Sequence, residues 1–239
     1  MGDRIAKQAL FEQFARVGKA VAHAGRLELL ELLAQGERSV DELTALTETG
    51  LSTVSAQLQE LRRARLVETR REGTRVFYRL AGDDVWVLLA ALRTVAAAHL
   101  GDVAPAARRY LGDDAGVEAI DRDELLRRTA AGEALVVDVR PRVEYQAGHV
   151  PGALSIPLDE LEARLAELPL DMEVVAYCRG PYCVFAHDAV RRLHQSGRRA
   201  RRLADGWPEW RLAGLPVATG TAPGRLHARS APARRDQRL

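Results

Sequence analysis

The sequence predicts two domains: an α+β domain built on a winged helix-turn-helix, and an α/β domain with a parallel sheet. Three observations support this prediction. Over about the first hundred residues, apolar residues recur at helical spacing and are followed by a β-hairpin pattern. Beyond residue 117, short apolar runs alternate with helical segments, which is typical of a parallel sheet covered by helices. A polar stretch containing Pro, Gly and Asp separates the two patterns and indicates a linker.

The composition is that of a folded chain. Its 239 residues accommodate two domains of ordinary size, and 47% hydrophobic residues are too many for a disordered chain. No apolar run reaches the roughly 18 residues of a membrane-spanning helix, so no membrane contact is expected. The charged N-terminus lacks the apolar core of a secretory signal, so we expect a cytoplasmic protein. The net charge of +2 is too small to indicate nucleic-acid binding by itself.

The first predicted elements are helices. Residues 5–36 show the apolar spacing of two consecutive helices. Ser39 followed by Glu42 predicts a capping box at the start of a short third helix, which Gly50 is expected to end. Ser52 is expected to cap the next helix. The predicted buried stripe of that helix is Leu51, Val54, Leu58 and Leu61. Two short helices joined by a tight turn form a helix-turn-helix.

A β-hairpin pattern follows. Residues alternate from Leu66 to Arg70 and again from Arg75 to Leu80, and Arg71-Glu72-Gly73 predicts the turn. A helix-turn-helix followed by a hairpin is a winged helix. Residues 84–100 then predict a helix that is apolar nearly all round, which in a small domain needs a partner to cover it. We therefore expect a homodimer formed through residues 84–100 and the N-terminal helix.

Positive charge is concentrated on the predicted hairpin and the end of the helix before it. Seven arginines lie between residues 62 and 79 and are opposed only by Glu68 and Glu72, a local net charge of +5. Charge on a wing favours contact with DNA phosphates, although a solvated basic surface would have the same composition. Small hydroxyl and amide side chains on the preceding helix suit contacts with base edges. The expected DNA-binding residues are Ser52, Thr53, Ser55, Gln57, Arg62, Arg70, Arg71 and Arg75.

Two segments resemble the ArsR/SmtB family of winged-helix repressors. Leu51 to Val67 is similar to the family's recognition helix, and Arg70 to Leu80 is similar to its wing. The resemblance covers about residues 10–100 and implies a double-stranded DNA operator as partner. Arg65 stands where the family usually has Gly at the end of the recognition helix, so a little local strain is expected there.

The metal sensors of that family have ligands that this sequence lacks. Arsenic-sensing members have two Cys in the helix before the recognition helix, and residues 37–43 here contain no thiol. Zinc-sensing members pair His and carboxylates on the last helix, whereas Asp84 and His99 lack that paired spacing. Sulfide-sensing members have two Cys within the winged helix, which are also absent. We expect no metal site and no cofactor, so the signal must enter elsewhere.

The second half has the pattern of an α/β domain. Residues 134–139 and 171–177 are apolar runs of strand type, and residues 158–168 and 184–195 are predicted helices. The tail has no periodicity and is rich in Arg, Pro, Ala and Gly, so disorder is expected. The expected boundaries are residues 1–101 for the DNA-binding and dimerisation domain, 102–116 for a linker, 117–217 for the α/β domain and 218–239 for a disordered basic tail.

Both cysteines of the chain, Cys178 and Cys183, lie in one short segment of this half. Cys178 follows an apolar strand and precedes a helix, so it is expected to face unpaired backbone N–H groups and the positive end of the helix. Arg179 adds positive charge nearby. These features favour the thiolate, which is the nucleophilic form, and would also stabilise a persulfide anion. The alternative is a buried, unreactive cysteine at the end of a strand.

Three motifs in this half resemble the rhodanese family, in the order in which that family has them. They are residues 138–145 with 148–153, the loop 178–183, and residues 205–210. The resemblance covers about residues 117–217 and implies that Cys178 accepts sulfur. It also implies that the loop residues surround this cysteine, namely Arg179, Gly180, Pro181 and Tyr182. Four further polar residues mostly tie loops together in that family, here Asp138, Arg140, Glu144 and His149.

Cys183 departs from the rhodanese pattern. The family often has Arg or Thr at this last loop position, where the side chain helps to bind thiosulfate. The loop is similar in length to loops that handle sulfur and one residue shorter than in related phosphatases and arsenate reductases, which favours sulfur transfer. A second thiol near a persulfide could resolve it into a disulfide or trisulfide. Packing of Cys183 against the helix core is the equal alternative.

Together these observations favour a homodimeric repressor that senses reactive sulfur species through persulfidation of Cys178. The expected partners are a DNA operator, a second copy of the chain, and a small sulfur donor such as thiosulfate, polysulfide or a low-molecular-weight persulfide. Two other functions stay open. The chain could be a rhodanese-type sulfurtransferase with an accessory DNA-binding domain, or a regulator that responds to a Cys178–Cys183 disulfide without sulfur transfer.

Overall fold

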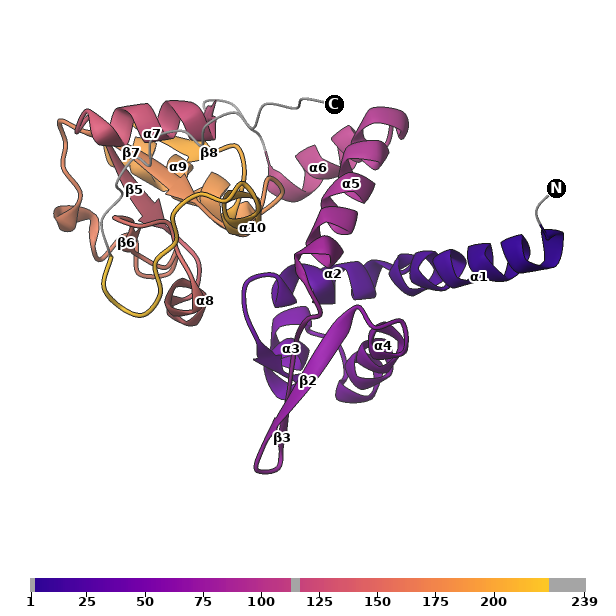
Figure 1. The fold of residues 1–239 in the computed structure, drawn as a ribbon. Coiled ribbons are helices and arrows are strands. Elements are labelled where there is room, and N and C mark those ends of the chain that lie inside the picture. Colours follow the sequence, from indigo (N-terminus) through magenta and orange to yellow (C-terminus); the bar gives the residue numbers. More distant parts are fainter. Residues whose placement is uncertain (1–2, 113–116, 224–239) are drawn as a thin grey trace, which may run out of the picture. The chain divides into compact units, whose positions relative to one another are not determined.

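The computed structural model describes residues 3–112 and 117–223 and divides the chain into two compact units, Met1–Val103 and Ala104–Leu239 (Figure 1). The first unit is a winged helix-turn-helix, and the second is an α/β domain with a parallel sheet. Both fold classes are those that the sequence predicts. Each unit has its own buried apolar core.

Helices form most of the first unit. They are α1 (Arg4–Val21), α2 (Ala24–Leu33), α3 (Val40–Thr47), α4 (Leu51–Arg63) and α5 (Asp83–His99). The predicted capping box of α3 is confirmed. The Glu42 N–H donates to the Ser39 hydroxyl at 3.2 Å, and the Ser39 N–H donates to the Glu42 carboxylate at 2.7 Å. The core of the unit fully buries Leu29, Leu43, Leu58, Leu61 and Trp86.

The turn between α3 and α4 differs from the prediction at both helix ends. α3 ends at Thr47, and Glu48 takes the left-handed conformation, with φ 51°. The N-cap of α4 is Gly50, and no side chain caps the helix there. The expected roles of Gly50 as the end of α3 and of Ser52 as a cap are therefore wrong. Because Glu48 reverses the chain early, Ser52 already lies in the first turn of α4.

The end of α4 forms a Schellman motif at Arg65. The Leu66 N–H donates to the Leu61 carbonyl and the Arg65 N–H donates to the Arg62 carbonyl, both at 3.0 Å. Arg65 takes the left-handed conformation, with φ 59°, which glycine adopts at lower cost. The strain expected where the family has Gly is therefore present.

The wing is a hairpin extended by a short third strand. β2 (Val67–Glu72) and β3 (Arg75–Leu80) pair antiparallel, and β1 (Arg38–Ser39) pairs with the other edge of β3. Glu72 pairs with Arg75, so the turn is Gly73-Thr74 and not the predicted Arg71-Glu72-Gly73. Gly73 has φ 59°, a conformation that suits a two-residue hairpin turn. Arg71 consequently lies within a strand, one residue from its end.

The second unit is built on a parallel sheet with strand order β4-β8-β7-β5-β6. The strands are β4 (Ala119–Ile120), β5 (Ala134–Asp138), β6 (Leu154–Ser155), β7 (Glu173–Tyr177) and β8 (Ala200–Leu203). Side chains along a strand alternate between two apolar layers, so that Val174 belongs to one layer and Val175 to the other. Residues of α9 (Val184–Gln195) complete the first layer. Residues of α7 (Arg122–Ala130), α8 (Arg142–Ala147) and α10 (Trp207–Leu212) complete the second.

Residues 158–168 do not form the predicted helix. They form turns and a short 3-10 helix, Leu165–Glu167, with backbone hydrogen bonds that span three residues, such as the Leu161 N–H to the Leu158 carbonyl. The four leucines of the segment still pack on the core of the unit. Consecutive turns therefore satisfy the same apolar spacing as a helix, which explains the wrong prediction.

Parts of the predicted linker and tail are structured. α6 (Val103–Leu111) lies within residues 102–116, and the Arg191 guanidinium donates to its last carbonyl, that of Leu111. In the tail, Ala218 bridges to His149, and the Gly220 N–H donates to the Gln146 carbonyl at 2.8 Å. The disorder expected from residue 218 therefore does not begin there. The rest of these two predictions falls on residues 113–116 and 224–239, which lie outside the described residues.

The helix α5 is apolar on two sides, and the first unit covers only one of them. Val85, Trp86 and Leu89 are buried, whereas Val87 and Val95 are more than half exposed. Further apolar side chains are exposed on α1, namely Ile5, Leu10, Phe11 and Phe14. These two surfaces belong to the helices for which the sequence predicts a subunit interface. Among the described residues, no single helix has the length and apolarity to cross a membrane, although the bent pair of α5 and α6 passes the same test.

Candidate functional site

The candidate site lies where strands of the parallel sheet end. Cys178 directly follows β7, Asp138 is the last residue of β5, and the segment 205–207 follows β8. These three strands are neighbours in the order β8-β7-β5, so their carboxyl ends meet at one edge of the sheet. In open parallel sheets this edge is where ligands bind. The loop from Cys178 to Cys183 connects β7 to α9 across it.

The two cysteines of this loop are joined in a disulfide. Their Cα atoms are 6.2 Å apart, within the range that a disulfide spans without movement of the backbone. Cys183 is the N-cap residue of α9, and its N–H donates to the Gly180 carbonyl at 3.1 Å, closing a tight turn. Both residues are buried, with exposed fractions of 1% for Cys178 and 8% for Cys183. The structure thus brings together the two thiols that the sequence singles out.

Arg179 forms an ion pair with the carboxylate of Glu144. Its guanidinium pairs with Glu144, with an Nη2–Oε1 distance of 2.6 Å, and lies over the Phe185 ring at 5.4 Å. Glu144 is 1% exposed, so this ion pair is largely shielded from water. The positive charge expected to favour a Cys178 thiolate is therefore balanced in part by Glu144.

A buried ion pair holds the strand ends around the loop. Arg140 and Asp138 are both fully buried, and the guanidinium donates to the Asp138 carboxylate at 2.6 Å and to the Gly148 carbonyl at 2.8 Å. Burial lowers the pKa of Arg140, but the charge of the Asp138 carboxylate outweighs it and raises that pKa above its usual value. The Tyr177 hydroxyl donates to Asp138 at 2.5 Å, and burial together with this carboxylate raises the pKa of Tyr177 well above its usual range. Arg140 therefore stays charged and links β5 to β7.

His149 fixes another part of the same unit. Its ring stacks on Tyr145 with centroids 3.6 Å apart, and it is fully buried. Nδ1 lies 2.8 Å from the Tyr145 carbonyl oxygen, and Nε2 lies 3.0 Å from the Ala222 carbonyl oxygen. These contacts tie α8 to the segment after residue 217. They describe how His149, like Asp138 and Arg140, would support loops, and that role stays a prediction.

Sequence reasoning missed the residues that support the loop from behind. The Trp207 N–H donates to the Cys178 carbonyl at 3.0 Å. A Cβ atom at Gly206 would lie only 2.3 Å from the Gly180 nitrogen, so the segment after β8 packs directly on the loop. A Cβ atom at Gly148 would lie 2.4 Å from the Trp207 ring. In the sequence, the Gly-Trp pair at 206–207 is the feature that could have predicted these contacts, because a glycine next to a large ring allows two backbone segments to pack closely.

On the recognition helix α4, the predicted base-contacting residues fall into two groups. Ser52 and Thr53 are exposed in the first turn, whereas Ser55 and Gln57 are half-buried. The Gln57 amide lies over Gly25 of α2, where an added Cβ atom would meet it at 2.8 Å. Gln57 is therefore only partly accessible, and its role in reading bases stays a prediction. Ser52 and Thr53 are the better placed of these side chains.

The predicted basic segment divides into paired and unpaired arginines. Arg70 pairs with Glu37 and Glu72, both at 2.7 Å, and Arg79 pairs with Glu68 at 2.6 Å. Arg63 pairs with Glu60 on the same helix. None of the ion pairs among residues 3–112 and 117–223 involves the remaining four, Arg62, Arg65, Arg71 and Arg75, which are all exposed. Those four carry the positive charge that is available to DNA.

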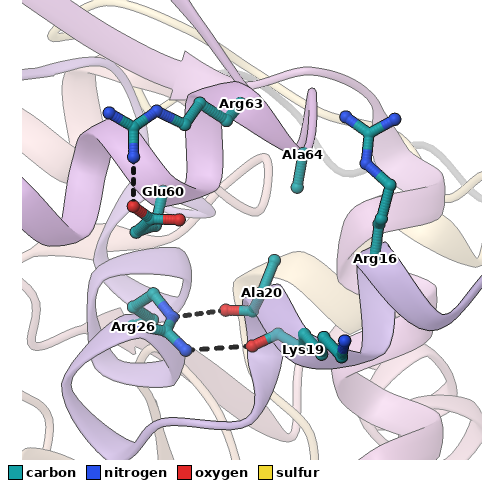
Figure 2. Close-up of a pocket in the computed structure, with 7 residues that line it drawn as sticks. All are labelled: Arg16, Lys19, Ala20, Arg26, Glu60, Arg63 and Ala64. Atoms are coloured by element: carbon teal, nitrogen blue, oxygen red, sulfur yellow. Dashed lines mark hydrogen bonds and ion pairs between the residues drawn. The ribbon is translucent and has the colours of Figure 1, made fainter. Parts of the chain in front are cut away.

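A pocket of about 300 Å³ lies between α1, α2 and α4 (Figure 2). Arg26 lies at its floor and donates to the carbonyls of Ala20 at 2.5 Å and Lys19 at 3.0 Å, so a cation sits at the C-terminal end of α1. The other charged residues that line the pocket are Arg16, Lys19, Glu60 and Arg63. Arg26 therefore fixes the end of α1 at this pocket, and no cysteine lines it.

The described residues contain no candidate metal site. Within residues 3–112 and 117–223, no group of three or more His, Cys, Asp or Glu side chains is arranged to hold a metal ion.

Two families match the two halves of the chain. The bacterial regulatory protein family arsR matches residues 23–69, and the rhodanese-like domain matches residues 121–213. The HTH-type transcriptional regulator Rv0324 of Mycobacterium tuberculosis is 57% identical over 218 residues, which cover 91% of this chain and 96% of the relative. A sulfurtransferase of Allochromatium vinosum is 36% identical over 103 residues, which cover 42% of this chain and 94% of that protein.

One solved structure among those similar to the first unit is the homodimeric winged helix-turn-helix DNA-binding domain of a Mycobacterium bovis protein. It is 53% identical and covers 42% of this chain and 91% of the solved chain, with a TM-score of 0.39. The match to Rv0324 extends through both units at high identity. The chain therefore belongs to the ArsR family of bacterial transcriptional regulators, and its C-terminal half is a rhodanese-like domain.

Proposed function

We propose that this regulator senses reactive sulfur species by persulfidation of Cys178, and that the modification changes its affinity for DNA. The observation that carries the proposal is the location of the chain's cysteines. Both lie in the loop between β7 and α9 of the rhodanese-like domain, at the edge where ligands bind. A thiol-based signal has no other residue to act on. The similarity of this domain to a sulfurtransferase supports sulfur as the group that is received.

The reaction needs the loop in its dithiol form. The Cys178 thiolate attacks a sulfane sulfur of a polysulfide or low-molecular-weight persulfide. A bond forms between the Cys178 sulfur and the sulfane sulfur, the donor's S–S bond breaks, and the shortened donor leaves with the electron pair.

We propose in addition that the regulator acts as a homodimer. The exposed apolar surfaces of α1 and α5 support this, because water-exposed apolar area of this kind marks protein interfaces. A two-fold dimer would place two recognition helices about 34 Å apart and predict an imperfect palindrome as operator. Sedimentation of a monomer at micromolar concentration would contradict it.

The test is DNA binding to the region upstream of the regulator's own gene, with and without polysulfide. Polysulfide should change the affinity of the reduced protein and leave that of Cys178→Ser unaltered. Untreated Cys178→Ser should bind as the wild type does, because the winged helix contains no cysteine. A Cys178→Ser protein that still responds fully would end the proposal.

Specific observations favour two other functions. The sulfurtransferase relative supports a sulfur-transferring enzyme, for which steady-state turnover of thiosulfate with a thiol acceptor is the test. The Cys178–Cys183 disulfide supports a regulator that responds to oxidation alone. In that case peroxide and polysulfide should have the same effect on DNA binding, and mass spectrometry should detect no added sulfur.

A further inference from the structure

With the loop cysteines joined, Cys178 has no thiolate to receive sulfane sulfur. We propose that the oxidised loop is itself a receptor for hydrogen sulfide, which opens the disulfide and leaves a persulfide on Cys178. This inference rests on the proposed function, because it reaches the same persulfide from a different compound. The loop in its dithiol form then reacts with the sulfane sulfur of polysulfides or persulfides, and the loop in its disulfide form reacts with hydrogen sulfide.

The step balances without any other reagent. Hydrosulfide attacks the Cys178 sulfur, a new S–S bond forms between them, and the Cys178–Cys183 bond breaks. Cys183 leaves as a thiolate with the electron pair, and the hydrosulfide proton stays on the terminal sulfur or passes to water. The incoming sulfur is oxidised by the same amount by which the Cys183 sulfur is reduced. The disulfide is therefore the oxidant.

The position of Cys183 decides which cysteine keeps the sulfur. Cys183 is the N-cap residue of α9, a helix of 12 residues, and its side chain caps no N–H in the disulfide form. Once released, its thiolate would lie at the positive end of that helix and could accept first-turn N–H groups. A disulfide breaks toward the better leaving thiolate. Cys183 should therefore leave, and the new sulfur should stay on Cys178.

Burial selects the smallest nucleophile. Cys178 is 1% exposed, so a bulky thiol cannot align with the disulfide without displacing the loop. Beside the loop, a pocket of about 490 Å³ is lined by Val139 and Phe185, which pack in the same apolar cluster as both cysteines, and also by the charged residues Arg142, Asp159 and Glu160. The Val139 N–H donates to the carbonyl of Tyr177, next to Cys178, and Phe185 is two residues beyond Cys183. Hydrogen sulfide is much smaller than glutathione, so it can reach the buried disulfide with less displacement of the loop.

The experiment treats oxidised full-length protein with one equivalent of sodium sulfide without oxygen, followed by alkylation and trypsin. Cleavage after Arg179 separates the two cysteines into different peptides. The Cys178 peptide should gain one sulfur atom, and the Cys183 peptide should be alkylated as a free thiol. Glutathione at equal thiolate concentration should react at least about tenfold more slowly, because the attacking thiol needs access. Phe185→Ala should reduce the difference in rate between sulfide and glutathione, because a smaller side chain packed beside the loop gives larger thiols better access.

Cys183→Ser separates this inference from the proposed function. The variant cannot form the disulfide, so sulfide should add no sulfur to it, whereas polysulfide should still persulfidate Cys178 and change DNA binding. Added sulfur on Cys183, reduction without retained sulfur, or an equally fast reaction with glutathione would overturn the sulfide receptor. If polysulfide also fails to alter DNA binding by reduced wild type, the proposed function falls with it.

Discussion

Arginine has different roles in the two units of the molecule. On the wing, Arg79 and Arg70 lie on the surface and pair with glutamates that are also exposed to water. In the rhodanese-like domain, Arg140 is fully buried between Asp138 and the rings of Tyr177 and Trp207. Exposed ion pairs contribute little to stability, whereas removing one partner of a buried pair leaves a charge without compensation. The exposed pairs of the wing should therefore contribute little to the stability of the first unit, whereas the buried pair of Arg140 and Asp138 should contribute strongly to the stability of the second.

The largest effect should come from breaking the buried pair. Asp138→Ala leaves the Arg140 guanidinium buried without its carboxylate and should lower the free energy of unfolding of the rhodanese-like domain by roughly 3–5 kcal/mol. Urea denaturation followed by circular dichroism measures it. Glu68→Ala, which breaks the exposed pair with Arg79, is the matched control and should cost less than about 1 kcal/mol. Equal losses in the two variants would remove the contrast between the units.

A smaller loss should follow from adding one methyl group behind the loop. In Gly206→Ala the new Cβ atom would lie 2.3 Å from the Gly180 nitrogen, so the loop must shift. Such overpacking should destabilise the domain by roughly 1–3 kcal/mol and slow sulfur uptake by Cys178. Chemical denaturation and the rate of persulfidation measure the two effects. Gly101→Ala is the control, because no atom lies within 4 Å of its added Cβ atom, and it should change neither.

The wing should affect DNA binding and not folding. Replacing Arg71 and Arg75 by Ala removes two arginines without ion-pair partners among the described residues, so affinity should fall for all sequences alike. The slope of log K against log salt should become shallower by roughly two. Fluorescence anisotropy at several salt concentrations measures it. Arg79→Ala, in which the lost charge was held by Glu68, should change the slope less. An unchanged slope in the double variant would exclude the wing from the interface.

The smallest expected effect is a gain in stability at Arg65. Arg65→Gly relieves the left-handed conformation at the end of α4 and should stabilise the winged helix by about 1 kcal/mol. Arg62→Gly removes the same side chain from the last turn of the helix, where the backbone is right-handed, and should destabilise the winged helix by up to about 1 kcal/mol. Thermal unfolding of both variants compares them. A loss of stability in Arg65→Gly would show that the Arg65 side chain contributes more than its backbone costs.

Features that local sequence determines were predictable. The capping box at Ser39 depends on residues three positions apart, and α9 was predicted at Val184–Gln195, as observed. The strain at Arg65 was expected from the family resemblance, because the family usually has Gly at that position. Both fold classes also followed from periodicity alone. Residues 158–168 were predicted wrongly because turns and helices can bury leucines at the same spacing.

The rest depended on contacts between distant segments. The Gln57 amide lies beside Gly25, which belongs to another helix. Arg179 is bound by Glu144 and Arg70 by Glu37, each more than thirty positions away in the sequence. The support of the loop by Gly206 and Trp207 requires β8 to lie beside β7. Neither periodicity nor spacing in the sequence predicts which distant residues come into contact in the fold.

Under the proposed function, the confinement of both cysteines to one loop has an evolutionary consequence. Mutations around that loop can change which sulfur compound reacts, and at what rate, without altering any residue of the recognition helix or the wing. Mutations in α4 can likewise move the regulator to a new operator while its sulfur chemistry is inherited intact. Selection can therefore act on the stimulus and on the target genes independently. A chimera that joins this rhodanese-like domain to the winged helix of a relative should carry its sulfur reactivity to a different set of genes.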